Sequence, residues 1–311
     1  MTATTQAEPA ATTAPAWLPV AAVGVTLLLW ASAFVAIRHL AGTFSAGSLS
    51  LGRLLVGALC LGAVALGRGL PRPTRGQWVS IVTIGILWFG VYNVALNAGE
   101  QHVDAGTAVM LIQVSPVLVA LLAATFLHER FTLYLGLGLA LAFGGVALIA
   151  TASGDSNGDR SVLGVVLCLL AAVVYSVSLV LQKPLVATLP AIHVTWLACT
   201  VGAVVCLPFS GQLLDDAGDA SASDLWWVVY LGVFPTAIAF TTFAYALRTM
   251  TASSLGVTTY LVPPITIVMG WLLLDETPPG MAYIGGALAL VGVAVARRKP
   301  RTLAAEAPAP S

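Results

Sequence analysis

Two stretches decide how this chain folds: SPVLVALLAATFLHE (Ser115–Glu129) and PPITIVMGWLLLDE (Pro263–Glu276). In each, a proline precedes a long apolar run that ends in a glutamate, and Pro116 and Glu129 lie 147 positions before Pro263 and Glu276. The same offset continues without gaps into the glycine-rich segments that follow, where it pairs Gly138, Ala142 and Gly145 with Gly285, Ala289 and Gly292. This match predicts that the chain contains an internal duplication.

The composition is typical of a membrane protein. Hydrophobic residues make up 59% of the 311 residues, and charged residues make up 8%, far below the roughly 25% of an average soluble domain. A helix needs about 20 mostly apolar residues to cross the bilayer. Ten stretches meet this requirement: 17–37, 45–66, 78–97, 104–127, 132–151, 162–182, 191–210, 225–247, 252–274 and 281–296. The predicted fold class is an all-α membrane protein with ten transmembrane helices.

The charged residues separate between the two faces that ten spans define. One face holds both termini and almost all the cations, whereas the loops of the other hold only Arg38 and Arg160. Because Lys and Arg are enriched in cytoplasmic loops, both termini are predicted to be cytoplasmic, in the cell (inner) membrane. The acids of the loops, Glu100 among them, are assigned to the external face. The cations of the first face are Arg68, Arg72, Arg75, Arg130, Lys183, Arg248, Arg297, Arg298, Lys299 and Arg301.

The duplication predicts two halves of five helices each. The first repeat spans 17–151 and the second 162–297, with a linker loop at 152–161, a disordered N-terminal tail at 1–16 and a cytoplasmic tail at 298–311. Since five is odd, the second repeat enters the membrane from the opposite face, so the halves are inverted. Inverted halves let a site at their interface open to either side in turn, as in secondary transporters. The alternative is that the duplication is only an inherited way to build a large bundle.

The paired prolines and glutamates predict specialised positions in the fourth and ninth spans. Pro116 and Pro263 each remove a backbone hydrogen bond near the middle of a span and free a carbonyl one turn earlier, which lipid cannot satisfy. Each kink is therefore expected to face protein or a water-filled cavity. Glu129 and Glu276 end the same helices and are interpreted either as polar helix ends or as members of gating ion pairs.

These motifs resemble those of a known family. The Pro-x12-Glu helix in both halves, WASAFVAIR (Trp30–Arg38), an arginine early in the second span, and glycine-rich fifth and tenth spans resemble the EamA-type branch of the drug/metabolite transporter superfamily. The resemblance implies ten helices, two EamA repeats, a central cavity and export of amino acids or other small metabolites. The second half departs from the first in having Pro264 after Pro263 and Tyr175 where the first has Trp30.

A set of polar and aromatic residues is predicted to line the cavity. Arg53 is the only basic residue placed well inside a span, so it is expected to bind a carboxylate or to gate; snorkelling to the interface is the alternative. Amides and aromatic rings suit an amphipathic solute, although interhelical hydrogen bonding and interface anchoring are alternatives for each. The candidate substrate-binding residues are Trp30, Arg53, Trp88, Tyr92, Asn93, Gln113, Tyr175, Ser178, Phe243 and Tyr260.

Other features restrict the function. The small-residue faces formed by Gly138, Ala142 and Gly145 and by their counterparts predict close helix packing, either within the chain or across a homodimer. No acid is placed at mid-membrane, so proton coupling has no support from the sequence. No metal-ligand spacing, nucleotide motif or other cofactor signature occurs, and nucleic acid is not an expected partner. The expected partners are a small-molecule substrate and the bilayer. A multidrug or other small-solute permease, an intramembrane enzyme and a membrane scaffold are the alternatives.

Overall fold

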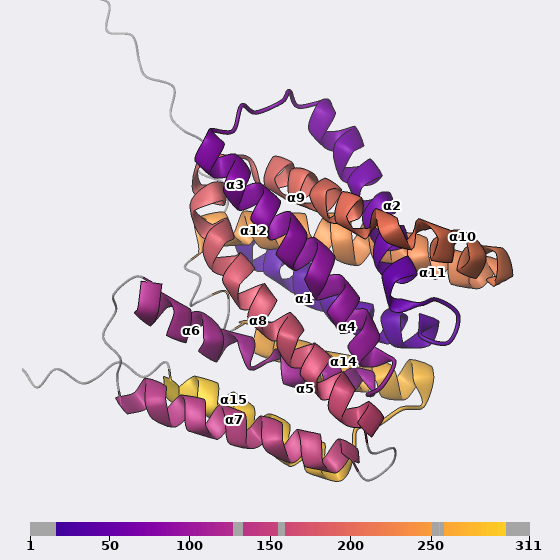
Figure 1. The fold of residues 1–311 in the computed structure, drawn as a ribbon. Helices are drawn as coiled ribbons and strands as arrows, with labels where there is room; N and C mark the ends of the chain where they lie inside the picture. Colours follow the sequence, from indigo (N-terminus) through magenta and orange to yellow (C-terminus); the bar gives the residue numbers. More distant parts are fainter. Residues whose placement is uncertain (1–16, 127–132, 155–158, 251–254, 256–257, 297–311) are drawn as a thin grey trace, which may run out of the picture.

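The computed structural model describes residues 17–126, 133–154, 159–250, 255 and 258–296. All regular structure within them is helical (Figure 1). Six helical stretches are long and apolar enough to cross a membrane: Trp17–Leu40, Ala46–Leu66, Arg75–Glu100, Val162–Thr188, Ala191–Asp219 and Ala222–Thr249. Four apolar stretches are shorter: Ala105–Val119, Gly136–Leu148, Val262–Leu274 and Gly280–Gly292. The chain is therefore an all-α membrane protein.

The helices fall into two successive groups along the chain. Those of the first group are α1 (Trp17–Leu40), α2 (Ala46–Leu66), α3 (Arg75–Ile84), η1 (Gly85–Val91), α4 (Tyr92–Glu100), α5 (Ala105–Ile112), α6 (Ser115–Phe126) and α7 (Leu133–Gly154). Those of the second are α8 (Asp159–Thr188), α9 (Ala191–Cys206), η2 (Leu207–Phe209), α10 (Ser210–Asp219), α11 (Ala222–Leu231), η3 (Gly232–Ile238), α12 (Ala239–Thr249), η4 (Thr259–Leu261), α14 (Val262–Leu274) and α15 (Gly280–Ala296).

The helix boundaries recur at the 147-residue offset. Helix α3 begins with a capping box made by Thr74 and Gln77. Helix α11 begins with a capping box made by Ser221 and Asp224, which lie 147 positions after Thr74 and Gln77. Both helices continue into a π-helix of 7 residues, η1 and η3. Helices α7 and α15 also begin 147 positions apart. For α3 with η1 and α11 with η3, the recurrence therefore extends to segments whose sequences have few residues in common.

The spans that contain Pro116 and Pro263 are interrupted rather than kinked. The first stops at Ile112 and restarts at Ser115, so the predicted span that contains Pro116 holds two helices, α5 and α6. In the second, the short 3₁₀-helix η4 precedes α14. Proline is tolerated at the first turn of a helix, where its missing N–H needs no partner. The helices accordingly restart at the prolines instead of bending around them.

Helices α7 and α15 lie side by side along one edge of the molecule (Figure 1). Gly145 allows this approach, because a Cβ at that position would lie 2.7 Å from the backbone nitrogen of Ala289 and closer still to the carbonyl oxygen of Gly285. Gly138 and Gly292 are buried as well, whereas the side chain of Ala142 is outside the described part. At Gly145 the small-residue face of α7 is thus covered by α15 of the same chain. A homodimer could therefore not form through the face of α7 at Gly145, because α15 already covers it.

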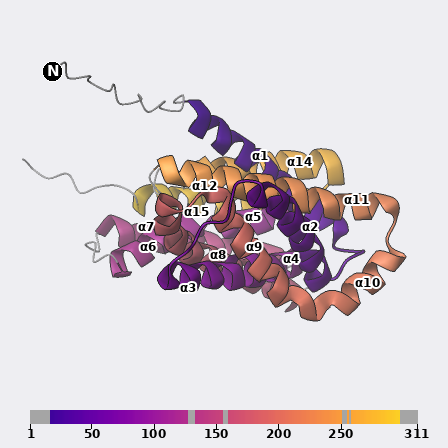
Figure 2. The same ribbon diagram turned by 90° about the horizontal axis from the view of Figure 1, so that it is seen from above.

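Helix α10 lies in a segment that was expected to be a loop. Helix α10 projects from the edge of the bundle that is opposite α7 (Figure 2). Its Asp216 accepts hydrogen bonds from the backbone N–H of Ser45, at 2.8 Å, and from the hydroxyl of Ser48, in the first turn of α2. A carboxylate at a helix N-terminus satisfies amide groups that the helix leaves free. Asp216 thereby attaches α10 to the start of the helix that carries Arg53.

Candidate functional site: a cavity between broken helices

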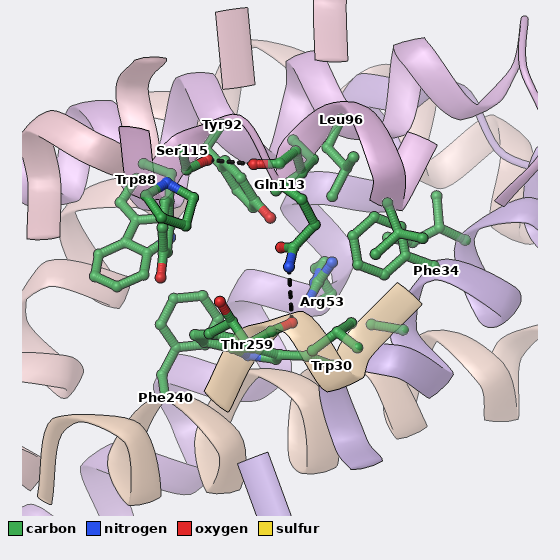
Figure 3. A pocket seen from close by; sticks show the side chains of 17 residues that line it. Trp30, Phe34, Arg53, Trp88, Tyr92, Leu96, Gln113, Ser115, Phe240 and Thr259 are labelled. Carbon is green, nitrogen blue, oxygen red and sulfur yellow. Dashed lines mark hydrogen bonds between the residues drawn. The ribbon is translucent and has the colours of Figure 1, made fainter. Parts of the chain in front are cut away.

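A cavity of about 60 Å³ lies where helices from both groups meet (Figure 3). Its lining comes from α1, α2, η1 and α4, from the break between α5 and α6, and from α8, α12, η4 and α14. A water molecule occupies about 30 Å³ in the liquid, and sites for drug-sized ligands span about 300–1,000 Å³. In this state the cavity therefore has room for a few water molecules.

Arg53 is the charged residue of the cavity. It is 4% exposed, and its Nε and Nη2 donate hydrogen bonds to Oγ1 of Thr236, at 3.2 and 3.1 Å. Thr236 belongs to η3, and its hydroxyl in turn donates to the carbonyl of Leu231 five residues earlier, at 2.8 Å. The wider turn of a π-helix thus brings a hydroxyl of the second group to a cation of the first. Arg53 does not snorkel to the surface, so that alternative is wrong.

Aromatic rings form one wall of the cavity. Trp88, in η1, is 1% exposed and contacts Tyr175 and Phe240 edge-on, each with ring centroids 5.1 Å apart. Trp30 of α1 packs against Phe240 and Phe243, at 5.5 and 4.8 Å. The indole Nε1 of Trp30 is buried and has no hydrogen-bond partner in the described part of the chain. This wall therefore includes an N–H donor that is free to take an acceptor.

A hydrogen bond joins the two helix breaks. Pro263 has no N–H, so it cannot donate an α-helical hydrogen bond to the carbonyl of Thr259, four residues earlier. That carbonyl accepts the backbone N–H of Val262, as in a 3₁₀ turn. Nε2 of Gln113, which ends α5, donates to this carbonyl at 2.9 Å (Figure 3). In the other break the hydroxyl of Ser115 donates to the carbonyl of Ile112, which Pro116 leaves free. A side chain thus donates to the carbonyl four residues before each proline, and Pro116 itself lines the cavity.

An ion pair connects α1 to the turn after α14. Nε of Arg38 donates to the two carboxylate oxygens of Glu276, at 2.9 and 3.1 Å, and Nη1 donates to the backbone carbonyl of Glu100 at 2.9 Å. Asp275 adopts the left-handed conformation, with φ of 53°, which turns the chain back at the end of α14. Glu276 is therefore in an ion pair in this structure, and its gating role stays a prediction. Its partner Arg38, the last residue of WASAFVAIR, was not predicted, and Glu129 lies outside the described residues.

The structure brings together most of the predicted residues. Those that line the cavity are Trp30, Arg53, Trp88, Tyr92, Gln113 and Tyr175. Asn93 instead donates within its own helix, to the carbonyls of Phe89 and Trp88 at 2.9 and 3.2 Å. Ser178 likewise donates to Val174 at 2.8 Å, and Phe243 supports the wall from behind. The side chain of Tyr260 is outside the described part.

Glu100 differs from its assignment to an external loop. It is the last residue of α4 and is 0% exposed. Hydropathy placed it at a span end next to polar residues, and only the helices packed around α4 bury it. Thr236 was also missed, because a threonine in an apolar span gives no signal of its own.

A helical membrane protein with a partly polar cavity between broken helices has the architecture of a secondary transporter. The sequence profile of the EamA-like transporter family matches residues 17–151 and 162–298, so the chain belongs to this family. Membership makes it a transporter and not an enzyme, which removes the intramembrane enzyme and the scaffold from the alternatives.

Individual relatives agree with this assignment. A protein of Streptantibioticus cattleyicolor named "Probable terminal-alkyne amino-acid exporter" is 37% identical over 278 residues, covering 89% of this chain and 93% of the relative. The transporter YdfC of Bacillus subtilis is 32% identical over 217 residues, 69% of each chain. A solved crystal structure at 22% identity covers 90% of this chain and 96% of its own, with a TM-score of 0.61, and supports the fold alone.

Proposed function

We propose that this protein exports amino acids or closely related small metabolites across the cell (inner) membrane by alternating access. The observation that carries the proposal is the convergence of Arg53 and the unpaired indole N–H of Trp30 on one aromatic cavity between broken helices. Arginine binds carboxylates through charge-assisted hydrogen bonds. Aromatic faces suit the apolar part of a small solute.

The charge of the cavity favours a carboxylate-bearing solute over a cation. Among the described lining residues Arg53 is charged and there is no Asp or Glu, so an organic cation would meet a like charge. A zwitterion would place its carboxylate at Arg53 and its side chain against Trp88 or Phe240. The S. cattleyicolor relative, with an amino acid in its name, points to the same class of solute.

Alternating access requires that the cavity open at each end in turn. We infer two inverted halves of five helices, and the recurrence of α3 and η1 as α11 and η3 supports this arrangement. The Arg38–Glu276 pair connects helices from the two halves and serves as a gate at one end. From the distribution of cations over the loops, the gated end is external and both termini are cytoplasmic.

A second candidate is a permease for lipophilic drugs or other small solutes. The aromatic wall of Trp30, Trp88, Tyr175 and Phe240 favours it, because stacked rings accept many apolar shapes. Arg53 argues against lipophilic cations but not against neutral or acidic compounds.

Counterflow in proteoliposomes tests the proposal. Purified protein is reconstituted into vesicles preloaded with one unlabelled amino acid, and uptake of the labelled form is followed for a panel of neutral amino acids. The panel includes propargylglycine, a terminal-alkyne amino acid, and the lipophilic cation ethidium. We expect counterflow with at least one amino acid, none with ethidium and none in empty vesicles. Exchange of ethidium without exchange of any amino acid would refute the proposed solute class.

A further inference from the structure

Glu100 is a buried acid whose carboxylate oxygens accept no hydrogen bond from the described residues. Its side chain is 0% exposed, and neither carboxylate oxygen has a hydrogen-bond partner in the described part of the chain. An ionised carboxylate is costly to bury without hydrogen bonds. Its burial without hydrogen bonds makes Glu100 a candidate site for binding a proton.

Packing at this position does not require a carboxylate. The residue 147 positions later is Leu247, in the last turn of α12, which is also 0% exposed. At both positions the backbone carbonyl accepts a hydrogen bond from a cationic side chain. Nη1 of Arg38 donates to the carbonyl of Glu100 at 2.9 Å, and Nζ of Lys183 donates to the carbonyl of Leu247 at 2.6 Å. A hydrocarbon side chain fills the second site, so the acid at the first has a further role.

Glu100 is adjacent to both the cavity and the ion pair. Tyr92 and Leu96, which line the cavity, precede it by two turns and one turn on the same face of α4. The charged and titratable groups around it are Arg38 from α1, Arg53 from α2, Asp104 before α5, Cys168 from α8, Tyr92 from α4 itself, and Glu276 after α14. Asp104 is engaged by Thr107, whose N–H and hydroxyl donate to it at 2.8 and 2.6 Å.

We propose that Glu100 is a proton-binding site that couples export to proton entry, which rests on the transport function proposed above. While Glu100 is protonated, Arg38 pairs with Glu276 and the gated end is closed. When the proton leaves to the cytoplasmic side, the ionised Glu100 competes with Glu276 for Arg38, whose Nη1 already contacts the Glu100 carbonyl. The ion pair separates, the solute leaves outward, and an external proton returns to Glu100 and restores the pair. One proton enters for each solute that leaves.

A pH gradient across the vesicle membrane tests the coupling in the wild-type protein. Propargylglycine is the probe, valinomycin and potassium hold the membrane potential at zero, and the vesicle interior is one pH unit more acidic than the medium. One-for-one exchange predicts about tenfold accumulation inside the vesicles, since one pH unit corresponds to a factor of ten. Absence of counterflow with the whole panel refutes the transport function. Counterflow without accumulation refutes the coupling alone.

Two variants test the assignment to Glu100. Glu100→Gln removes the titratable group and is expected to lower the accumulation ratio from about tenfold to about onefold. Glu100→Leu copies the residue at position 247 and gives the same readout if the glutamine variant fails to fold. Asp215→Asn, at an exposed carboxylate of α10, is the control and retains the wild-type ratio. Accumulation near tenfold in either Glu100 variant overturns the proposal, as does loss of counterflow in both while they remain folded.

Discussion

Replacing Arg53 by methionine tests the carboxylate site. Arg53 is 4% exposed, and methionine is long and apolar enough to occupy its place without leaving a buried charge. A hydrogen bond to a charged group contributes about 1.5–3 kcal/mol. At 1.36 kcal/mol per factor of ten, loss of one such bond to the solute weakens binding by about 10- to 150-fold.

The assay compares an amino acid with its carboxamide, which lacks the carboxylate. Affinities are measured by titration calorimetry on detergent-solubilised protein, with the amino acid that gives the strongest counterflow. Wild type is expected to prefer the acid by about 10- to 150-fold, and Arg53→Met is expected to bind both forms about equally. Thr236→Val is the matched control, since it removes the hydroxyl beside Arg53 but keeps the charge and therefore the preference. If Arg53→Met still preferred the acid by more than about tenfold, the carboxylate would bind elsewhere.

Four other changes test the rest of the structure. Glu276→Gln removes a partly exposed ion pair of about 0.2–1 kcal/mol that holds the external end closed. Thiol reagents applied outside should therefore label a cysteine introduced in the cavity up to about fivefold faster, and an unchanged labelling rate argues against a gate. Gln113→Leu removes the hydrogen bond between the two helix breaks, worth about 0.5–1.5 kcal/mol, which should lower the melting temperature in detergent, and an unaltered melting curve contradicts this bond. Gly145→Leu should separate two packed helices and reduce the yield of folded protein, whereas Gly145→Ala should reduce it less; equal yields refute the close contact. Reporter fusions should be cytoplasmic after Arg75 and external after Asp216, and a cytoplasmic signal at the latter would overturn the assigned orientation.

The amino-acid sequence alone was enough to predict the class of protein and much of the helix pattern. Hydropathy over windows of about 20 residues identifies which segments leave water, and the 147-residue offset of Pro116 and Pro263 predicted where two spans are altered. Arg53 and Trp88 could be named because a charge or a large polar aromatic inside an apolar segment is rare. These signals are local, so each can be seen within a single stretch of chain.

Which of these residues act together depends on the packing of helices that are distant in the chain. Arg38 and Glu276 are 238 positions apart, and Gln113 and Thr259 are 146 apart, so no local pattern pairs them. Glu100 shows the limit most directly, because a glutamate at a span end is expected to reach water. The neighbouring helices α2, α5 and α8 cover it instead, and its burial depends on contacts between segments that hydropathy treats separately. Which face of a helix meets protein rather than lipid or water is fixed by packing between helices distant in the chain.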